Sequence, residues 1–308
     1  MKNVVVIGGG HGQAVILRGL KDLKDVNLSA IVTVADDGGS TGRIRKRLNI
    51  PGMGDIRNCL VALSDEDSII SKLMDYRFLG SNEEDIIGHN LGNLILTATS
   101  ELTGSFEAAI EEMSNKLNIK GKVIPSSLDI ITLYAKMDDG VVVRGETNIP
   151  KYNHAIEEVF YKDEVNANPK AVEAIINADI VILGIGSLYT SILPNLIIPG
   201  INEALNVTRA KKVYFANCMT QPSETYKYDL KDHIKALYKH KVSIDLIIKH
   251  TEMIPYEILD KYNKTNSDEV INNNDVNIPI KELELLDFSN GLARHSPEKI
   301  KKAVEELI

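Results

Sequence analysis

The feature that most limits how this chain can fold is a strand, a glycine turn and a helix within its first twenty residues. Residues 4–7 are Val-Val-Val-Ile, an apolar and mostly β-branched run that predicts a strand buried on both faces. Four glycines follow, at Gly8, Gly9, Gly10 and Gly12, and apolar residues at helical spacing come directly after them. Such a turn lets a ligand approach the backbone, where the unpaired N–H groups of the helix N-terminus favour phosphate. The segment therefore predicts a phosphate or nucleotide contact, and the alternative is a tight turn that binds nothing.

The turn departs from two known phosphate motifs. Read from Gly8, the Gly-x-Gly-x-x-Gly pattern of dinucleotide-binding folds has Gln13 at its third glycine position, and read from Gly10 it has Val15 there. The Lys-Ser/Thr pair of a P-loop is absent from the turn. Because the fingerprint is broken and no hydride-transfer partner is evident, NAD-dependent oxidoreduction is the weakest of the functions that the turn suggests. His11 is more readily a helix cap or a hydrogen-bond donor than an acid-base catalyst.

Strand and helix patterns alternate along most of the chain. A second apolar run at 28–35 makes a strand-helix-strand unit with the first, and the two strands should be parallel. Further buried strands are predicted at 179–184, 212–217 and 243–248, with helical patterns between them. The loop at 137–140 lies between two apolar runs and predicts a β-hairpin, which would be an inserted or edge element. The sequence thus predicts an α/β fold with a mostly parallel sheet and one hairpin.

The length of the chain fits one large α/β domain or two smaller ones, because 308 residues can bury a sizeable core in either case. Residues 43–128 are mainly helical in pattern and predict an insertion. Residues 250–308 are less regular, with a polar run at 272–275 that predicts a solvated loop and a Ser296-Pro pair that predicts a C-terminal helix. We therefore expect a single domain over residues 1–308 that includes both regions.

Charge and cysteine content exclude some functions. The 43 acidic and 35 basic residues give a net charge of −8, which argues against nonspecific nucleic-acid binding. Cys59 and Cys218 lie far apart without the spacing of metal ligands, so neither a disulfide framework nor a zinc site is expected. No apolar run approaches the ~18 residues of a membrane span, and the first strand begins too early for a signal peptide. A cytoplasmic protein with no membrane span is the simplest expectation.

Four polar loops, at 8–13, 36–42, 184–191 and 217–225, each follow a predicted parallel strand. The carboxyl ends of parallel strands meet at one edge of a sheet, and open α/β sheets bind their ligands there. The loops contain glycine, hydroxyl, amide and carboxylate groups and little that would pack a core. One crevice lined by these loops is therefore the expected binding site.

Charged side chains in and near these loops allow more than one interpretation. Asp36 and Asp37 could hydrogen-bond a ribose or hold a hydrated Mg2+ beside phosphates, and equally they could be turn and helix-cap residues. Arg57 lies near Asp55 and Asn58 in the sequence. Its guanidinium could contact phosphate with both prongs or form an ion pair with Asp55.

No side chain stands out as an obligatory nucleophile. Ser187 and Ser191 lack the Gly-x-Ser-x-Gly elbow, so we interpret them as donors to phosphate or hydroxyl groups. Cys59 and Cys218 have no neighbour in sequence that would lower the pKa of a thiol. His89 precedes a helix and is again more readily a cap or donor than a catalyst.

Five polar motifs occur in order, with plausible spacing, over residues 1 to about 240. They are Asp36-Asp-Gly-Gly-Ser-Thr-Gly-Arg-Ile-Arg45, Gly54-Asp-Ile-Arg-Asn-Cys-Leu60, Gly88-His-Asn-Leu-Gly-Asn-Leu94, Gly186-Ser-Leu-Tyr-Thr-Ser-Ile-Leu-Pro-Asn195 and Asn217-Cys-Met-Thr-Gln-Pro222. Together they resemble the bacterial gluconeogenesis factor family (YvcK-type proteins), which belongs with the CofD-like 2-phospho-L-lactate transferases. Five motifs in one order are far more specific than a single glycine loop.

The resemblance implies a Rossmann-like three-layer α/β/α fold that binds a nucleotide-type ligand. Gluconeogenesis factors are similar to one another in binding UDP-sugars such as UDP-N-acetylglucosamine, and they support cell shape and cell-wall metabolism during gluconeogenic growth. The resemblance therefore implies a non-enzymatic regulator that binds a UDP-sugar. A homo-oligomer and an unidentified protein partner are further expectations.

The transferase relatives imply an alternative, an enzyme that joins a phospholactyl group to a deazaflavin with the help of Mg2+. Asp37 and Asp55 look equivalent to the aspartates that hold Mg2+ in those relatives, and no other cofactor is expected. Loops and motifs together predict the following ligand-binding residues: Gly9, Gly10, His11, Gly12, Asp36, Asp37, Gly39, Ser40, Arg43, Arg57, Asn58, His89, Asn90, Asn93, Gly186, Ser187, Thr190, Ser191, Asn217, Thr220 and Gln221.

Overall fold

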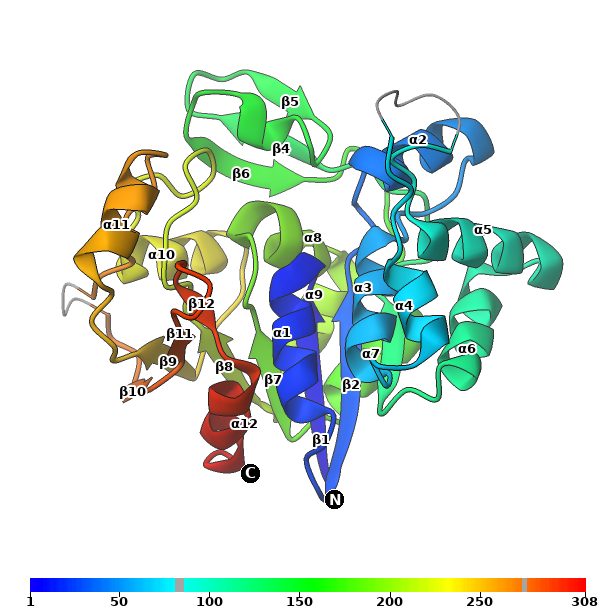
Figure 1. Ribbon diagram of the computed structural model, residues 1–308. Helices are drawn as coiled ribbons and strands as arrows, with labels where there is room; N and C mark the ends of the chain where they lie inside the picture. Colours follow the sequence, from blue (N-terminus) through cyan, green and yellow to red (C-terminus); the bar gives the residue numbers. More distant parts are fainter. Residues whose placement is uncertain (81–85, 273–275) are drawn as a thin grey trace.

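A seven-stranded parallel sheet forms the middle layer of the structure, a computed structural model that describes residues 1–80, 86–272 and 276–308 (Figure 1). Its strands are β1 Lys2–Gly8, β2 Val26–Val32, β3 Lys122–Pro125, β7 Ile180–Leu183, β8 Lys211–Phe215, β9 Leu246–His250 and β10 Ile280–Leu283. The order across the sheet is β10-β9-β8-β7-β1-β2-β3. The chain therefore starts in the middle, fills one side as far as β3, and then returns through β7 to fill the other side.

β1 is an inner strand of the sheet, next to the central β7, and its side chains are apolar on both faces. Residues 4–7 are each at most 2% exposed. Val4 lies beside Leu28 of β2 on one side and Ile180 of β7 on the other. The predicted strand buried on both faces is confirmed, and the glycine turn that follows β1 lies in the middle of the carboxyl edge.

Helices cover both faces of the sheet. They are α1 Gly10–Leu20, α2 Gly39–Leu48, α3 Gly54–Leu63, α4 Ile69–Asp75, α5 Leu91–Thr103, α6 Phe106–Lys116, α7 Pro169–Ile176, α8 Leu193–Leu196, α9 Pro199–Val207, α10 Leu230–Lys239, α11 Tyr256–Asn263 and α12 Pro297–Glu305. The crossovers β1-α1-β2 and β7-α9-β8 run in opposite directions, so right-handed connections place α1 and α9 on opposite faces. In Figure 1, α1 and α12 lie in front of the sheet and α7 and α9 behind it. The expected three-layer α/β/α fold is confirmed.

A second, smaller sheet lies over the carboxyl edge of the main one (Figure 1). Strands β4 Tyr134–Met137 and β5 Val142–Arg144 form the predicted hairpin, and β6 Ile156–Phe160 pairs with the other side of β4. Two long-range hydrogen bonds fasten this sheet to the body. Arg45 Nη2 donates to Ile131 O at 2.6 Å, and Tyr161 Oη donates to Pro194 O at 2.8 Å.

The sequence pattern misses β3, β6 and β10, and also two strands of two residues each, β11 Leu286–Asp287 and β12 Arg294–His295. β3 lies within residues 43–128, so that region is not helical throughout, and β10 and α11 lie within the C-terminal region predicted to be irregular. The three longer missed strands have only four or five residues, and each carries Lys or Glu among its apolar residues, which hides the strand period. The predicted loop at 272–275 falls mostly outside the described residues.

The C-terminal helix starts where its sequence predicts. The Ser296 hydroxyl accepts a hydrogen bond from Lys299 N, and Pro297 is the first residue of α12. Within the described part of the chain, no helix is long and apolar enough to cross a membrane.

Candidate ligand site at the carboxyl edge of the sheet

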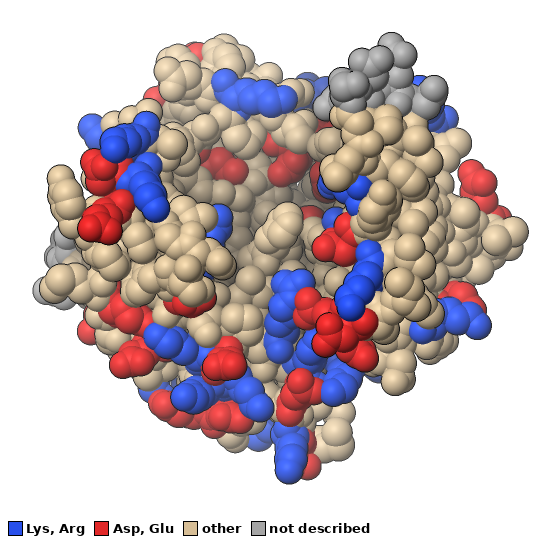
Figure 2. Space-filling view, in the orientation of Figure 1, with Lys and Arg blue, Asp and Glu red and all other residues tan. Residues whose placement is uncertain are grey.

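The four predicted polar loops follow β1, β2, β7 and β8, which are neighbours in the sheet. They therefore share one edge, and Figure 2 shows that face hollowed beneath the small sheet, with Asp and Glu side chains inside the hollow. Three of the loops are shorter than predicted, the first of them because α1 already begins at Gly10. α2 already begins at Gly39, and a π-helical turn, η2 Leu188–Ile192, leads into α8. Gly39, Thr190 and Ser191 are thus helical residues rather than loop residues.

The glycines after β1 allow close packing of neighbouring loops. A Cβ atom on Gly9 would lie 2.5 Å from Asp55 Oδ2 and 2.6 Å from Thr33 Cγ2. A Cβ atom on Gly12 would overlap the carbonyl of Ile185, in the loop after β7. Glycine at these positions is therefore required by the protein's own neighbours, whatever ligand binds there.

Asp55 occupies the N-terminus of α1. Its carboxyl accepts hydrogen bonds from the Gly10 backbone N–H and from the Asn58 side chain. Burial, followed by the nearby charge of Asp36, raises the pKa of Asp55 to about 7. The helix N-terminus predicted to bind phosphate thus already holds an acidic group of the same chain, while His11 in its first turn is exposed.

Asp36 and Asp37 point to different partners. Gly38 N donates to Asp36 Oδ1 at 2.9 Å, and burial raises the pKa of this carboxyl. Asp37 Oδ1 accepts from the backbone N of Thr147 at 2.9 Å and from its hydroxyl at 2.8 Å. Asp37 therefore links the loop after β2 to the small sheet, and its charge also acts on Asp36 and Glu146.

Two acidic residues of this site were absent from the sequence prediction. Burial, with the charges of Asp36 and Asp55 next, raises the pKa of Glu146 to about 8. Burial also raises the pKa of Glu224 to about 7, and Glu224 is one of the charges that act on Glu146. Glu224 lay within the predicted loop at 217–225, but Glu146 follows β5, and no local signal places that hairpin over the sheet.

The loops after β7 and β8 are bonded to each other. Thr190 Oγ1 donates to Glu224 Oε1 at 2.8 Å, and Asn217 Nδ2 donates to Gly186 O at 3.0 Å. Gln221 Nε2 donates to Ser187 Oγ. These predicted residues are together in the structure.

Ser191 and Thr220 differ in their distance from the hollow. The Ser191 side chain lies near Gly10 and Gly186, within the group of loops. Thr220 Oγ1 accepts from Asp268 N at 2.8 Å, and Ser267 Oγ donates to the Thr220 carbonyl. Thr220 therefore fastens the C-terminal region to the loop, and its hydroxyl already has a partner other than a ligand.

The starts of α2 and α5 meet in a second group of predicted residues. Ser40 Oγ accepts from Asn90 N at 3.1 Å and shares a hydrogen bond of 3.0 Å with His89 Nδ1. Asn90 caps α5 by accepting from Asn93 N at 3.1 Å. Burial and the nearby charge of Arg43 lower the pKa of His89, which favours the neutral ring. Arg43 Nη1 donates to Ile87 O at 2.6 Å.

Arg57 pairs with a carboxylate other than the predicted Asp55. Its guanidinium is buried and forms an ion pair with Asp75, at the end of α4, rather than with Asp55. The pair joins α3 to α4, because a guanidinium this buried is stabilised by a carboxylate. The predicted pair with Asp55 is wrong, and the remaining effect of Arg57 on Asp55 is a weak lowering of its pKa.

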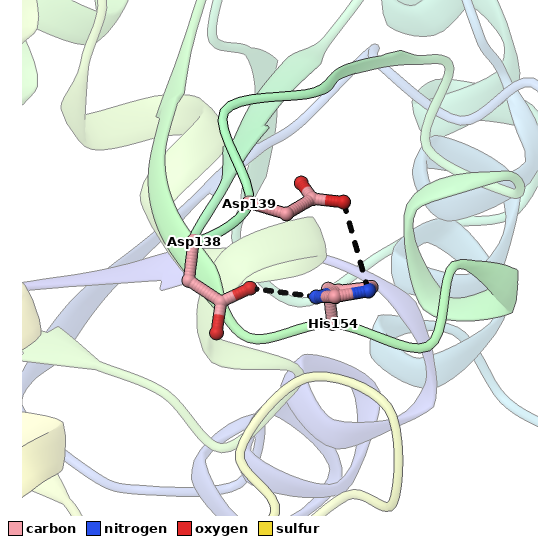
Figure 3. A group of neighbouring side chains, drawn as sticks. All are labelled: Asp138, Asp139 and His154. Carbon is pink, nitrogen blue, oxygen red and sulfur yellow. Dashed lines mark hydrogen bonds and ion pairs between the residues drawn. The ribbon is translucent and has the colours of Figure 1, made fainter.

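Asp138, Asp139 and His154 form the one group of three potential metal ligands that lie close enough to share an ion within the described ranges (Figure 3). His154 Nδ1 lies 2.9 Å from Asp138 Oδ1, and His154 Nε2 lies 3.6 Å from Asp139 Oδ2. Tyr152 Oη also donates to Asp139 at 2.8 Å. All three ligand-type residues are exposed and satisfied by these contacts, so we interpret the group as a clamp on the hairpin turn.

A groove of about 990 Å3 lies at the opposite edge of the sheet, where β2 and β3 begin. Several of its charged side chains are paired with others of the chain, for example Lys170 with Glu107 at 3.4 Å. The carboxyl edge differs, because several carboxyls there raise one another's pKa values. Groups held in this way favour a bound ligand or cation, which makes the carboxyl edge the better candidate site.

Comparisons with known proteins agree along nearly the whole chain. The profile of the family described as 2-phospho-L-lactate transferase CofD matches residues 4–286. A gluconeogenesis factor of Bacillus subtilis is 44% identical over 318 residues, which cover 99% of this chain and 98% of that protein. A gluconeogenesis factor of Halalkalibacterium halodurans is 47% identical over 274 residues, 88% of this chain and 84% of the relative. A crystal structure of a Bacillus halodurans protein superposes with a TM-score of 0.94 at 42% identity and covers 99% of both chains.

Proposed function

This chain belongs to the CofD family and, within it, to the gluconeogenesis factors, and on that premise we propose that it binds a nucleotide sugar at the carboxyl edge of its sheet. The ligand class is UDP-sugars such as UDP-N-acetylglucosamine. The bound form supports gluconeogenic growth and, through an unidentified protein partner, cell shape and cell-wall metabolism.

The observation that carries this proposal is the convergence of four polar loops in one hollow beneath the small sheet. α2 begins at that edge, and a helix N-terminus favours the negative charge of a diphosphate. The side chains most able to attack a substrate are held in structural roles. Burial raises the pKa of Cys218 to about 11 and that of Cys59 well above its usual value, so both thiols stay protonated.

A divalent cation fits the acidic part of this hollow. Asp36, Asp55 and Glu146 each have a raised pKa, in part because their negative charges repel one another. A hydrated Mg2+ would neutralise that repulsion and would supply positive charge beside a diphosphate. Asp55 and Asp36 are the groups best placed to hold it, and Asp37 would take part through the oxygen that Thr147 does not occupy.

Calorimetry tests the binding proposal. The protein should bind UDP-N-acetylglucosamine saturably, more tightly with Mg2+ than with EDTA, whereas NAD should bind weakly or not at all. Asp55→Asn should reduce the benefit of Mg2+, because it removes a charge from the acidic cluster. Exposed Asp67→Asn serves as the matched control, with unchanged binding. Absence of heat with UDP-sugars up to millimolar concentration would contradict the proposal.

A second candidate function is transfer of a phospholactyl group to a deazaflavin, as the name of the matching family suggests. Purified protein with Mg2+, a nucleotide-linked phospholactate donor and a deazaflavin acceptor should then form a phosphodiester, as the acceptor hydroxyl displaces a nucleoside monophosphate from the donor phosphorus. Mass spectrometry should detect both the phosphodiester and the released nucleoside monophosphate. Asp37→Asn and Asp55→Asn should abolish the product. A wild-type protein that binds the donor and yields no product would leave the regulator as the supported function.

The growth role can be tested in cells. A strain that lacks this protein should grow slowly on a gluconeogenic carbon source and normally on glucose. Complementation with the wild type should restore growth, and complementation with Asp55→Asn should not if ligand binding is required. Equal rescue by both proteins would separate the growth role from this site.

A further inference from the structure

The loop that follows β8 presents hydrogen-bond acceptors that have no donor. Asn217 is 8% exposed and Glu224 is 5% exposed. Asn217 Oδ1, Gln221 Oε1 and Glu224 Oε2 are buried, and none has a hydrogen-bond partner in the part of the chain that the structure describes. Buried polar atoms without partners are rare, because each costs free energy, and they often mark a place where a ligand binds.

The orientation of Asn217 is fixed by its partner. Its Nδ2 donates to the carbonyl of Gly186 at 3.0 Å, and a carbonyl cannot donate, so the amide cannot be turned around without loss of this bond. Oδ1 must therefore be the atom that lacks a partner. The ligand atom that satisfies it has to be an N–H or O–H donor.

Glu224 already accepts hydrogen bonds from the donors of the facing loop. Its carboxyl accepts the backbone N–H groups of Tyr189 and Thr190 and the Thr190 hydroxyl. The π-helical turn that begins at Leu188 therefore points its N–H groups at a carboxyl of the same chain. A phosphate in this position would meet an acidic group where it needs donors, so this wall of the hollow does not suit phosphate.

The two walls of the hollow thus differ in chemistry. On the β1–β2 side, the carboxyls of Asp36 and Asp55 crowd together with Glu146 and fit a cation with its phosphates. On the β7–β8 side, two amide oxygens and one carboxylate oxygen lack donors. The charge of Glu224 is one of those that raise the pKa of Glu146, so the two carboxyls lie within electrostatic range of each other.

We propose that Asn217 and Glu224 form a subsite for a neutral, donor-bearing group, such as a sugar hydroxyl or an acylamino N–H, and that this subsite selects nucleotide sugars over nucleotides that end in phosphate or carboxylate. The proposal rests on nucleotide binding at the carboxyl edge, and it adds the direction of the ligand. The diphosphate lies toward β1 and β2, and the sugar lies toward β7 and β8.

A ligand series on the wild-type protein tests the subsite without any mutation. Calorimetry at pH 8 with Mg2+ would compare UDP, UDP-glucose and UDP-glucuronate, because Glu224, with a pKa of about 7, is then ionised. UDP-glucose should bind about tenfold more tightly than UDP, the effect of one or two hydrogen bonds to charged or buried acceptors. UDP-glucuronate should lose this advantage, because its carboxylate meets Glu224.

Glu224→Gln tests the residue itself. The glutamine keeps an oxygen for Thr190 and places an NH2 donor where the unpaired acceptor was, so UDP-glucose should lose about tenfold in affinity while UDP changes by less than about twofold. Exposed Glu203→Gln on α9 is the matched control and should keep the wild-type ratio. Thermal melts verify that both variants fold. If Glu224→Gln does not fold, the ligand series on the wild-type protein alone decides whether the subsite exists.

The outcomes separate this inference from the proposed function. If none of the three nucleotides binds the wild type, nucleotide binding itself fails and the subsite fails with it. If all three bind with equal affinity, or if Glu224→Gln weakens UDP as much as UDP-glucose, nucleotide binding stands and the subsite is wrong.

Discussion

The Gln13 side chain is fully buried and joins the two central strands. Its Nε2 donates to Val6 O of β1 at 3.0 Å and to Ile31 O of β2 at 2.9 Å. Cys59 Sγ lies 3.5 Å from its Oε1. The residue that breaks the dinucleotide fingerprint is thus a structural bridge, and a glycine there would lose all three contacts.

Gln13→Leu should lower the free energy of unfolding by about 1–3 kcal/mol, because it leaves a buried thiol and two strand carbonyls without the amide. Urea unfolding monitored by circular dichroism would measure the change. His11→Ala, two residues earlier on the exposed face of α1, is the control and should change stability by less than about 0.5 kcal/mol. Equal effects of the two substitutions would show that the bridge contributes nothing.

Gly12→Ala tests the contact between the loops after β1 and β7. The added methyl group would overlap the Ile185 carbonyl, which is backbone and cannot rotate away. The loops would have to separate, which should cost about 1–3 kcal/mol of stability and weaken nucleotide binding. Thermal unfolding and calorimetry on the same variant would measure both. A variant with wild-type stability would mean that the two loops move apart freely.

At the level of residues, the sequence predicts which loops meet but not which atoms pair. Asp37 bonds Thr147, 110 positions away in the chain, and no local pattern encodes that partner. Arg57 pairs with Asp75 rather than Asp55 because α4 packs beside α3. This contact between helices is again not encoded in the local sequence. Glu146 could not be predicted as a site residue, since the sequence of its hairpin does not indicate that the hairpin lies over the sheet. Ligand contact by the predicted residues stays a prediction.

At the level of elements, helix caps connect the second group of polar residues to stability. The Asn90 side chain accepts from Asn93 N and donates to Asp75 O, so it both caps α5 and ties that helix to α4. Asn90→Ala should destabilise the protein by about 1–2 kcal/mol, as losses of helix caps do.

Chemical denaturation would check the Asn90 prediction. Ser100→Ala, later in α5, is the control, because it leaves the start of the helix intact. If the two alanine variants have the same midpoint of unfolding, the cap has no role in stability.

The elements that the sequence predicts correctly are those with a strong period. β1 and β7 are continuous apolar runs in the middle of the sheet, and burial on both faces makes such runs conspicuous. The missed strands β3 and β10 are the two edges, where one side meets solvent and charged residues interrupt the pattern. Short edge strands are recognisable only when a neighbour to pair with is already known.

For the whole molecule, two sets of buried groups make stability depend on pH in opposite directions. Asp55, Glu146 and Glu224 have pKa values of about 7, 8 and 7, above their usual values, so their contribution is complete at low pH and is lost as pH rises through these values. His295 has its pKa lowered by burial to about 4, and that of His250 is also lowered. Their contribution is present above the usual histidine value and is lost as pH falls toward 4.

The metal-free protein should therefore be less stable at pH 8.5 than at pH 6.5, because the buried carboxyls ionise across that range, whereas most of the histidine contribution is already gained by pH 6.5. Urea unfolding at the two pH values, with EDTA and then with Mg2+, would measure this. Mg2+ should restore stability at pH 8.5 more than at pH 6.5, since the cation binds ionised carboxylates. Asp55→Asn should reduce the pH dependence. A wild-type protein equally stable at both pH values would contradict the raised pKa values.

The pairing of β1 with β7 also sets an order of events during synthesis. Val4 can pair with Leu28 as soon as β2 has been synthesised. Its partner on the other side, Ile180, leaves the ribosome far later. Until then one side of the apolar strand β1 has no neighbouring strand, which is a reason for a chaperone to bind the nascent chain. The nucleotide cannot protect this intermediate, because the loops after β7 and β8 do not yet exist. Ribosome-arrested chains that end before residue 180 should fail to retain the ligand, and chains arrested after complete emergence of the sheet should retain it.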